Sequence, residues 1–207
     1  MSPLPVRMED HWALEPGTDL GRPRLMWFMP AGAYEPVAEL AQKGQDRLAG
    51  LGGLDLVPRE WLHITTLIAG YKDQITADQT DAMIRHARRL AARIRPVTIS
   101  LGRVLYHPRA VMLDAGPAAN LEPVLDTVQQ ATRAATGRDG QLHTAPWKPH
   151  ITLAYSKTTQ AAGPVIEALG RQLPSREVTI SQVSLVSQTH RQQWTWDLIS
   201  DVHLGRN

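Results

Sequence analysis

The chain of 207 residues, which contains eight histidines, carries two nearly identical segments: HITT at 63–66 and HITL at 150–153. Each lies in an apolar run typical of a β-strand, so the His and the Thr two positions later should project from the same face. Two such strands side by side would bring two imidazoles and two hydroxyls into one pocket. Imidazoles exchange protons near neutral pH, and hydroxyls donate hydrogen bonds to oxygens that gain negative charge. The spacing therefore predicts an acid–base site.

The motif taken alone is weak evidence. A His followed two positions later by Ser or Thr is expected about once by chance among eight histidines. The shared His-Ile-Thr, the matching apolar context and the equivalent places in two similar halves favour a site over buried core histidines. The other histidines, which lack the pattern, are at 11, 86, 107, 143, 190 and 203. A metal site held by the pair would need a third ligand, and no His or carboxylate has a supportive spacing beside either motif.

Composition narrows the possible chemistry. The absence of cysteine excludes disulfides, thiol nucleophiles and cysteine-ligated metals. Net charge is only +2, but most basic residues are arginines, whose guanidinium suits bidentate phosphate contact. That preference allows a phosphate or nucleic-acid ligand, although coding bias would produce the same composition. No segment approaches the ~20 apolar residues of a membrane span, so we expect a cytoplasmic protein.

The predicted helices and strands occur in a similar order in the two halves of the chain. In the first half we expect a strand, a helix, the motif strand, a second helix and a strand pair that closes this half, at 24–30, 35–51, 62–69, 76–95, 97–106 and 110–115. In the second half we expect a helix, the motif strand, a helix and two strands, at 121–136, 150–155, 160–172, 177–188 and 193–202. Strands mixed with helices without strict alternation predict an α+β fold with largely antiparallel sheets.

The motif strands extend to PREWLHITT at 58–66 and to WKPHITLAYS at 147–156. These segments resemble the 2H phosphoesterase superfamily, in particular its bacterial 2'-5' RNA ligase-like branch, and the resemblance covers nearly the whole chain. The leader, with Asp10-His11-Trp12, is similar to that of a subgroup of actinobacterial members. One departure is Thr66, where the family usually has Leu after the His-x-Thr.

The resemblance implies one bilobal domain over 1–207, with 1–22 as a leader strap. Two pseudo-symmetric lobes of mainly antiparallel sheet, with helices on the outer faces, would enclose an active-site cleft that holds a phosphodiester. It implies His63 as acid and His150 as base in hydrolysis, roles that could be exchanged with direction and substrate. Thr65 and Thr152 would donate hydrogen bonds to the non-bridging oxygens. No metal or other cofactor is required.

Three functions remain open. The first is a metal-independent phosphodiesterase for an RNA terminus or small nucleotide, acting by 2',3'-cyclic phosphate hydrolysis or reversible 2'-5' linkage chemistry. The second is a phosphodiesterase for a 2'-5' oligonucleotide or an ADP-ribose cyclic phosphate. The third is a non-catalytic RNA-binding module, against which the intact motifs argue. No membrane or obligate protein partner is expected.

Six further residues are candidates for binding the substrate: Tyr155, Trp147, Tyr71, Lys148, His190 and Arg191. The rings of Tyr155 and Trp147 could stack on a base or ribose, with simple packing as the alternative. His190 and Arg191 lie in the predicted turn between the last two strands, where a solvated turn is the alternative.

The earlier turn raises the same question for Arg103, His107 and Arg109. His11 and Trp12 are interpreted as parts of a structural strap, and the arginine-rich helix at 85–95 as a solvent-facing surface.

Overall fold

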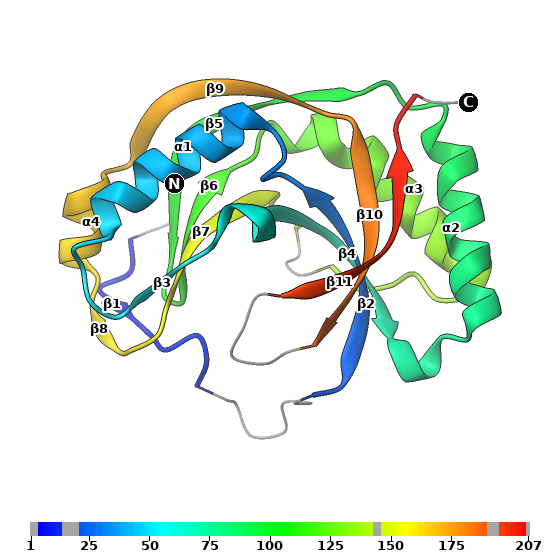
Figure 1. Ribbon diagram of the computed structural model, residues 1–207, viewed down its shortest axis with the longest axis horizontal. Helices are drawn as coiled ribbons and strands as arrows, with labels where there is room; N and C mark the ends of the chain where they lie inside the picture. Colours follow the sequence, from blue (N-terminus) through cyan, green and yellow to red (C-terminus); the bar gives the residue numbers. More distant parts are fainter. Residues whose placement is uncertain (1–3, 14–20, 143–145, 190–194, 206–207) are drawn as a thin grey trace.

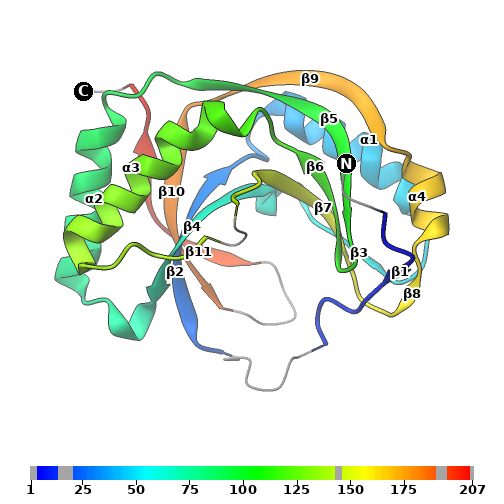
Figure 2. The same cartoon turned by 180° about the vertical axis from the view of Figure 1, so that it is seen from behind.

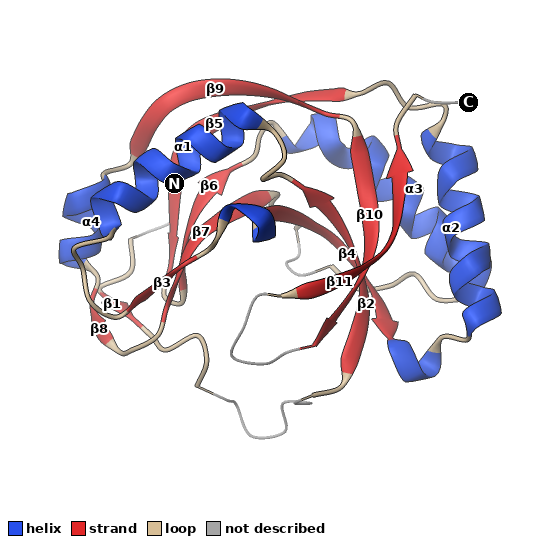
Figure 3. Ribbon diagram, in the orientation of Figure 1, coloured by secondary structure: helices blue, strands red, loops and turns tan. Residues whose placement is uncertain are grey.

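The computed structural model describes residues 4–13, 21–142, 146–189 and 195–205. Nine strands of these ranges form one antiparallel sheet in the order β11-β10-β2-β4-β7-β6-β5-β9, with β3 beside β7. The sheet bends into two lobes with helices on the outer faces (Figure 1, Figure 3). The prediction of an α+β fold with mainly antiparallel sheet is confirmed.

The first lobe consists of β2 (Pro23–Pro30), β4 (His63–Tyr71), β10 (Gln182–Thr189) and β11 (Trp196–His203), with helices α2 (Ala77–Ala91) and α3 (Ala118–Thr136). The second consists of β3 (Leu54–Leu56), β5 (Val97–His107), β6 (Ala110–Asp114), β7 (His150–Ser156) and β9 (Gln172–Ile180), with helices α1 (Glu35–Leu48) and α4 (Gly163–Leu169). Short elements are β1 (Arg7–Met8), β8 (Gln160–Ala161) and the 3-10 turns η1 (Arg59–Trp61) and η2 (Lys72–Gln74). Within the described ranges, no helix is long and apolar enough to cross a membrane.

The predicted strand pair at 97–115 does not close the first half of the chain. Strand β6 pairs with β7 and β5 pairs with β9, whereas β10, from the end of the chain, pairs with β2. The helices are exchanged in the same way, since α1 packs on β9 and α3 packs on β4 (Figure 2). Both lobes therefore contain elements of both halves. Hydrophobic periodicity identifies a strand but not its partner, so the sequence could not predict this exchange.

Two predicted elements also have different bounds. The helix expected at 160–172 is confined to α4, because β8 pairs with β1 of the leader and β9 begins at Gln172. The strand expected at 177–188 is divided between β9 and β10 at Ser181. There the Ser181 amide donates a hydrogen bond of 2.9 Å to the hydroxyl of Tyr34. At this point the chain passes from the second lobe to the first.

The core lies between the sheet and the helices. Along β2, alternation turns Trp27 and Met29 toward the helices, and both are fully buried. The indole of Trp27 donates to the hydroxyl of Thr132 on α3 at 3.2 Å, which fastens that helix to the sheet. The opposite face of β2 carries Met26 and Phe28 in a smaller apolar cluster on the inner side of the lobe. The ring of Phe28 stacks on the imidazole of His63 on the neighbouring β4, with ring centroids 4.0 Å apart.

Candidate active site

The two motif strands meet where the lobes join, at the antiparallel pair of Ile64 on β4 and Ile151 on β7. Both isoleucine side chains are fully buried and belong to the main core. Side chains alternate along a strand, so the His and Thr on either side of each isoleucine project from the opposite face. That face lines the space between the lobes.

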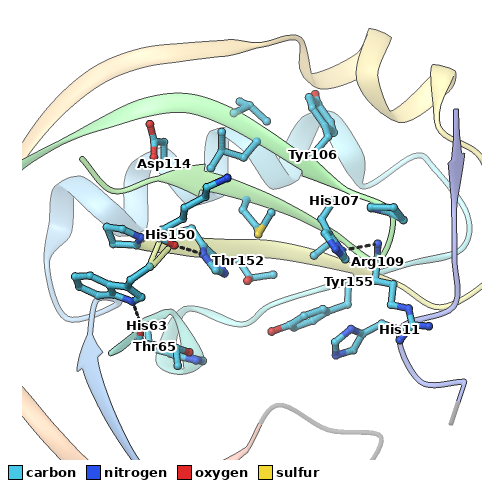
Figure 4. A pocket seen from close by; sticks show the side chains of 18 of the residues that line it. His11, His63, Thr65, Tyr106, His107, Arg109, Asp114, His150, Thr152 and Tyr155 are labelled. Carbon is cyan, nitrogen blue, oxygen red and sulfur yellow. Dashed lines mark hydrogen bonds between the residues drawn. The ribbon is translucent and has the colours of Figure 1, made fainter. Parts of the chain in front are cut away.

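The antiparallel register at this junction decides which motif residues face each other. His63 lies across from Thr152, and Thr65 lies across from His150, on either side of the isoleucine pair. All four side chains line one cavity, and Figure 4 shows them along it.

Both motif histidines are held in the same way by the main chain. The Nδ1 atom of His63 lies 2.7 Å from the carbonyl oxygen of Trp61, and the Nδ1 atom of His150 lies 2.8 Å from that of Lys148. A carbonyl oxygen can only accept a hydrogen bond, so Nδ1 must carry the proton in each ring. The neutral form of each imidazole then has its basic lone pair on Nε2, and the charged form has an acidic proton there. Either ring can thus act as base or acid through Nε2.

Each motif strand has a β-bulge just after its Thr. The extra residue is Thr66 in β4 and Leu153 in β7, and both are fully buried. A bulge shifts the alternation of side chains by one position. It returns Ile68 and Tyr155, each five residues after its motif His, to the face that lines the cavity. Without the bulge, regular alternation would turn Tyr155 into the core.

The cavity has a volume of about 1110 Å³ and a positive character. Its described lining includes the cationic side chains Arg24, Arg103, Arg109, Lys148 and Arg171. Among the same lining residues the acidic side chain is Asp114, which lies 3.6 Å from Arg103 in an ion pair. A cleft with this excess of positive charge attracts anionic ligands.

A metal centre built on the two histidines would need at least a third protein ligand. Across the described ranges, no group of three or more His, Asp or Glu side chains is arranged to hold a metal ion. Asp114 lies across from His150 in the register of β6 and β7, and it pairs with Arg103.

Comparison with known proteins identifies the family. The sequence model of the 2'-5' RNA ligase superfamily matches residues 30–192, which include both motif strands and more than half of the chain. The chain belongs to the 2'-5' RNA ligase superfamily. The resemblance to the 2H phosphoesterases is thereby confirmed. No curated protein sequence matches the chain at a significant level.

Solved structures share the fold of this superfamily member. TT0787 of Thermus thermophilus is 19% identical, with a TM-score of 0.66 over 88% of this chain and 98% of that one. E. coli LigT complexed with NADP+ is 15% identical, with a TM-score of 0.63 over 89% and 99% of the two chains. The MHV ns2 PDE domain is 18% identical, with a TM-score of 0.59 over 81% and 99%. At these identities the likeness establishes the two-lobe fold alone.

Three of the expected substrate-binding residues line the cavity of this superfamily member: Tyr155, Trp147 and Lys148. The indole nitrogen of Trp147 donates a hydrogen bond of 3.1 Å to the carbonyl oxygen of Thr65, so this ring is fixed beside the first motif. Tyr155 lies along β7 on the other side of Thr152, whose side chain it contacts. The motif residues therefore lie between two aromatic rings.

The other expected residues do not join this group. Tyr71 is not among the described lining residues, and the guanidinium of Arg22 lies 3.9 Å above its ring near the end of β4. His190 and Arg191 lie outside the described residues. Tyr71 therefore makes a cation–π contact with Arg22.

Two segments outside the expected substrate-binding residues also line the cavity. Arg103, His107 and Arg109 come from β5 and the turn after it, which pair beside β7 and not within the first lobe. His11 and Trp12 come from the leader, which was interpreted as a strap. Their side-chain types are suited to binding a nucleotide. The strand pairing that places them in the cavity could not be predicted from the sequence.

The hydroxyl of Tyr155 has a perturbed acidity. Burial raises the pKa of Tyr155, and the hydrogen bond with the Thr152 side chain lowers it in part. Tyr155 therefore stays neutral throughout the neutral pH range. Its ring and hydroxyl are available for contact and positioning, and its charge does not oppose an anionic ligand.

Proposed function

We propose that the protein is a metal-independent phosphodiesterase that acts on RNA ends or small nucleotides by acid–base catalysis. The observation that carries this proposal is the matched setting of His63 and His150. Each ring is held at Nδ1 by a main-chain carbonyl two residues earlier, so that proton transfer runs through Nε2. Each also lies across from a Thr of the other motif. Two such groups on one cavity can take and give a proton at the same phosphate.

In hydrolysis of a 2',3'-cyclic phosphate, His150 acts as base and takes a proton from water at Nε2. The water oxygen forms a bond to phosphorus, and the bond from phosphorus to one ribose oxygen breaks. His63, protonated at the start, gives its Nε2 proton to that departing oxygen. The two roles are interchangeable in the reverse direction, in which a ribose hydroxyl attacks and a 2'-5' linkage forms. In both cases protons and charge balance without a metal ion.

Thr65 and Thr152 stabilise the transition state in this scheme. As the new bond forms, negative charge grows on the non-bridging phosphate oxygens. Hydroxyl groups fixed beside the reacting phosphate bind that charge more strongly than the starting charge, which lowers the barrier. The cationic lining of the cavity supports the same function through longer-range attraction.

The lining and volume of the cavity favour a nucleotide ligand. Trp147 and Tyr155 offer aromatic faces on two sides of the motif residues, on which a base or ribose can stack. Structures of E. coli LigT contain ATP, 3'-AMP and phosphate, which is consistent with nucleotide binding in this fold. A 2'-5' oligonucleotide or an ADP-ribose cyclic phosphate remains an alternative substrate, since the cavity of about 1110 Å³ exceeds the size needed for one small ligand.

The test is a substrate panel of 2',3'-cyclic mononucleotides, cyclic-phosphate-ended RNA and 2'-5' dinucleotides. Wild-type protein should turn over at least one class in the presence of EDTA, and His150→Ala should lose most of that activity. His203→Ala, an exposed histidine on β11 outside the cavity, is the matched control and should retain it. Tight binding without turnover across the panel would favour an RNA-binding module. Loss of activity with EDTA would refute the metal-independent mechanism.

A further inference from the structure

The leader segment 4–13 is built into one end of the cavity. Its strand β1 pairs with β8. The amide of Glu9 donates to the carbonyl of Pro108 at 2.7 Å, and the amide of His11 donates to the carbonyl of Ser156 at 2.7 Å. The Trp12 indole donates to a carboxylate oxygen of Asp55 at 3.0 Å. These bonds fix the leader across β7 and the β5–β6 turn. Its side chains therefore form a fixed part of the cavity wall.

Three rings meet at this end of the cavity. The imidazole of His11 stacks on Tyr155 with ring centroids 4.1 Å apart and an interplanar angle of 28°. The indole of Trp12 lies 5.6 Å from the Tyr155 ring. All three residues line the cavity, and Figure 4 shows His11 and Tyr155 together beside Arg109. The bulge in β7 is what turns Tyr155 toward this group. The result is an aromatic surface of the kind that binds nucleobases.

Polar groups beside these rings suit a phosphate or ribose. The amide of Arg109 donates to Nδ1 of His107 at 3.2 Å, so Nδ1 carries no proton and Nε2 must carry it in the neutral ring. Burial and the positive charge of Arg109 lower the pKa of His107, against the opposing effect of Glu9. His107 thus has the opposite tautomer to the motif histidines and is a donor at Nε2. The Arg109 guanidinium adds a cation, held 3.3 Å from the Glu9 carboxylate.

We propose that this end of the cavity is a nucleotide subsite beside the site of the reacting phosphate. The neighbouring base packs against His11, Trp12 and Tyr155, and its phosphate or ribose oxygens accept hydrogen bonds from His107 and Arg109. The hydroxyl of Tyr155 contacts the side chain of Thr152, and the Tyr155 ring extends from there to His11 of the leader, so this end of the cavity adjoins the reacting phosphate. The subsite therefore serves the nucleotide next to the one that is cleaved. This inference rests on the proposed function, and it assigns oligonucleotide ends, in preference to single nucleotides, as the substrate class.

The experiment compares kcat/KM for the cyclic-phosphate-ended dinucleotide ApA>p with that for 2',3'-cyclic AMP. Wild-type protein should prefer the dinucleotide by about tenfold or more, which is the effect expected from stacking one base on an aromatic ring. His11→Ala and His107→Ala should each reduce this preference about tenfold. His11→Phe, which keeps a ring, and His107→Gln, which keeps a donor, should restore part of it. His86→Ala, on the outer helix α2, is the control and should leave the preference unchanged.

A second measurement tests the subsite independently of catalysis. Calorimetric titration with the products ApAp and 3'-AMP reports binding without turnover, and the same variants should lose the preference for ApAp. Equal kcat/KM for both substrates in wild type, or a preference that His11→Ala and His107→Ala leave unchanged, overturns the subsite. Absence of turnover on both of these substrates and on the 2'-5' dinucleotides overturns the proposed function, and the calorimetric preference then still decides the subsite. Thermal unfolding of each variant shows whether the fold is intact.

Discussion

Replacing Thr152 by Val gives the sharpest test of the transition-state role of the motif hydroxyls. Thr152 lies half-buried on β7, across from His63. Valine has the same shape and β-branching, so the strand and its packing should be preserved. The substitution removes only the hydroxyl, which would donate to a non-bridging oxygen and which also contacts the hydroxyl of Tyr155.

The magnitude follows from the arrangement of donors. Loss of one fixed donor to a developing oxyanion typically lowers kcat by about 100- to 1,000-fold, or about 2.7–4 kcal/mol. Thr65 supplies a second hydroxyl from the other strand, on the opposite side of the isoleucine pair. Because that donor remains, we expect a loss near the lower end, about 100-fold in kcat with a smaller change in KM. Thr65→Val should cause a similar loss, since the two motifs are related by pseudo-symmetry.

The assay is steady-state hydrolysis of the substrate identified by the panel, for Thr152→Val, Thr152→Ser and Thr179→Val. Thr152→Ser keeps the hydroxyl and should retain most activity, and Thr179→Val changes an exposed threonine on β9 outside the cavity. An absorbance titration should show a higher pKa for Tyr155 in Thr152→Val, because burial then acts without the opposing hydrogen bond. A folded Thr152→Val protein with kcat within threefold of wild type would refute the role of this hydroxyl.

Three further outcomes are expected. His63→Ala and His150→Ala should each remove one limb of a bell-shaped pH dependence of kcat/KM; an unchanged profile in either would exclude that ring as an acid or base. Thr66→Val should raise the free energy of urea unfolding by about 1 kcal/mol, because the Thr66 hydroxyl is buried and no hydrogen-bond partner for it occurs in the described structure; a decrease would contradict this. Burial raises the pKa of Tyr106 to about 12, against a lowering by Arg171. Its neutral form is favoured in the folded state, so the stability it contributes should be present below pH 10 and be lost as pH rises toward 12; Tyr106→Phe should flatten this dependence.

Several features could be predicted from the sequence because they depend on local chemistry. The start of α2 follows from Thr76 and Gln79, which form a capping box. The two-residue period of the motif strands places each His and its Thr on one face. The end of α3 follows from Gly137, which adopts the left-handed conformation that terminates helices. In each case the deciding residues lie within a few positions of one another.

Other features could not be predicted, because they depend on which strands pair. The position of Arg109 in the cavity requires β6 to lie beside β7, although the sequence order assigned that hairpin to the first half. Alternation alone would turn Tyr155 into the core, and the bulge at Leu153 reverses this. The stack of His11 on Tyr155 joins residues 144 positions apart. No local pattern carries such information.

The sequence by itself determined the reactive groups, the face each occupies on its strand and the family to which the chain belongs. The tertiary structure alone decided that the two motif strands meet at Ile64 and Ile151, so that each His lies across from the Thr of the other motif. It also decided the tautomers, since the carbonyls of Trp61 and Lys148 fix a proton at Nδ1 of the motif histidines. The physical reason is that side-chain type and period are local properties, whereas strand pairing and hydrogen-bond partners arise only when distant segments pack together.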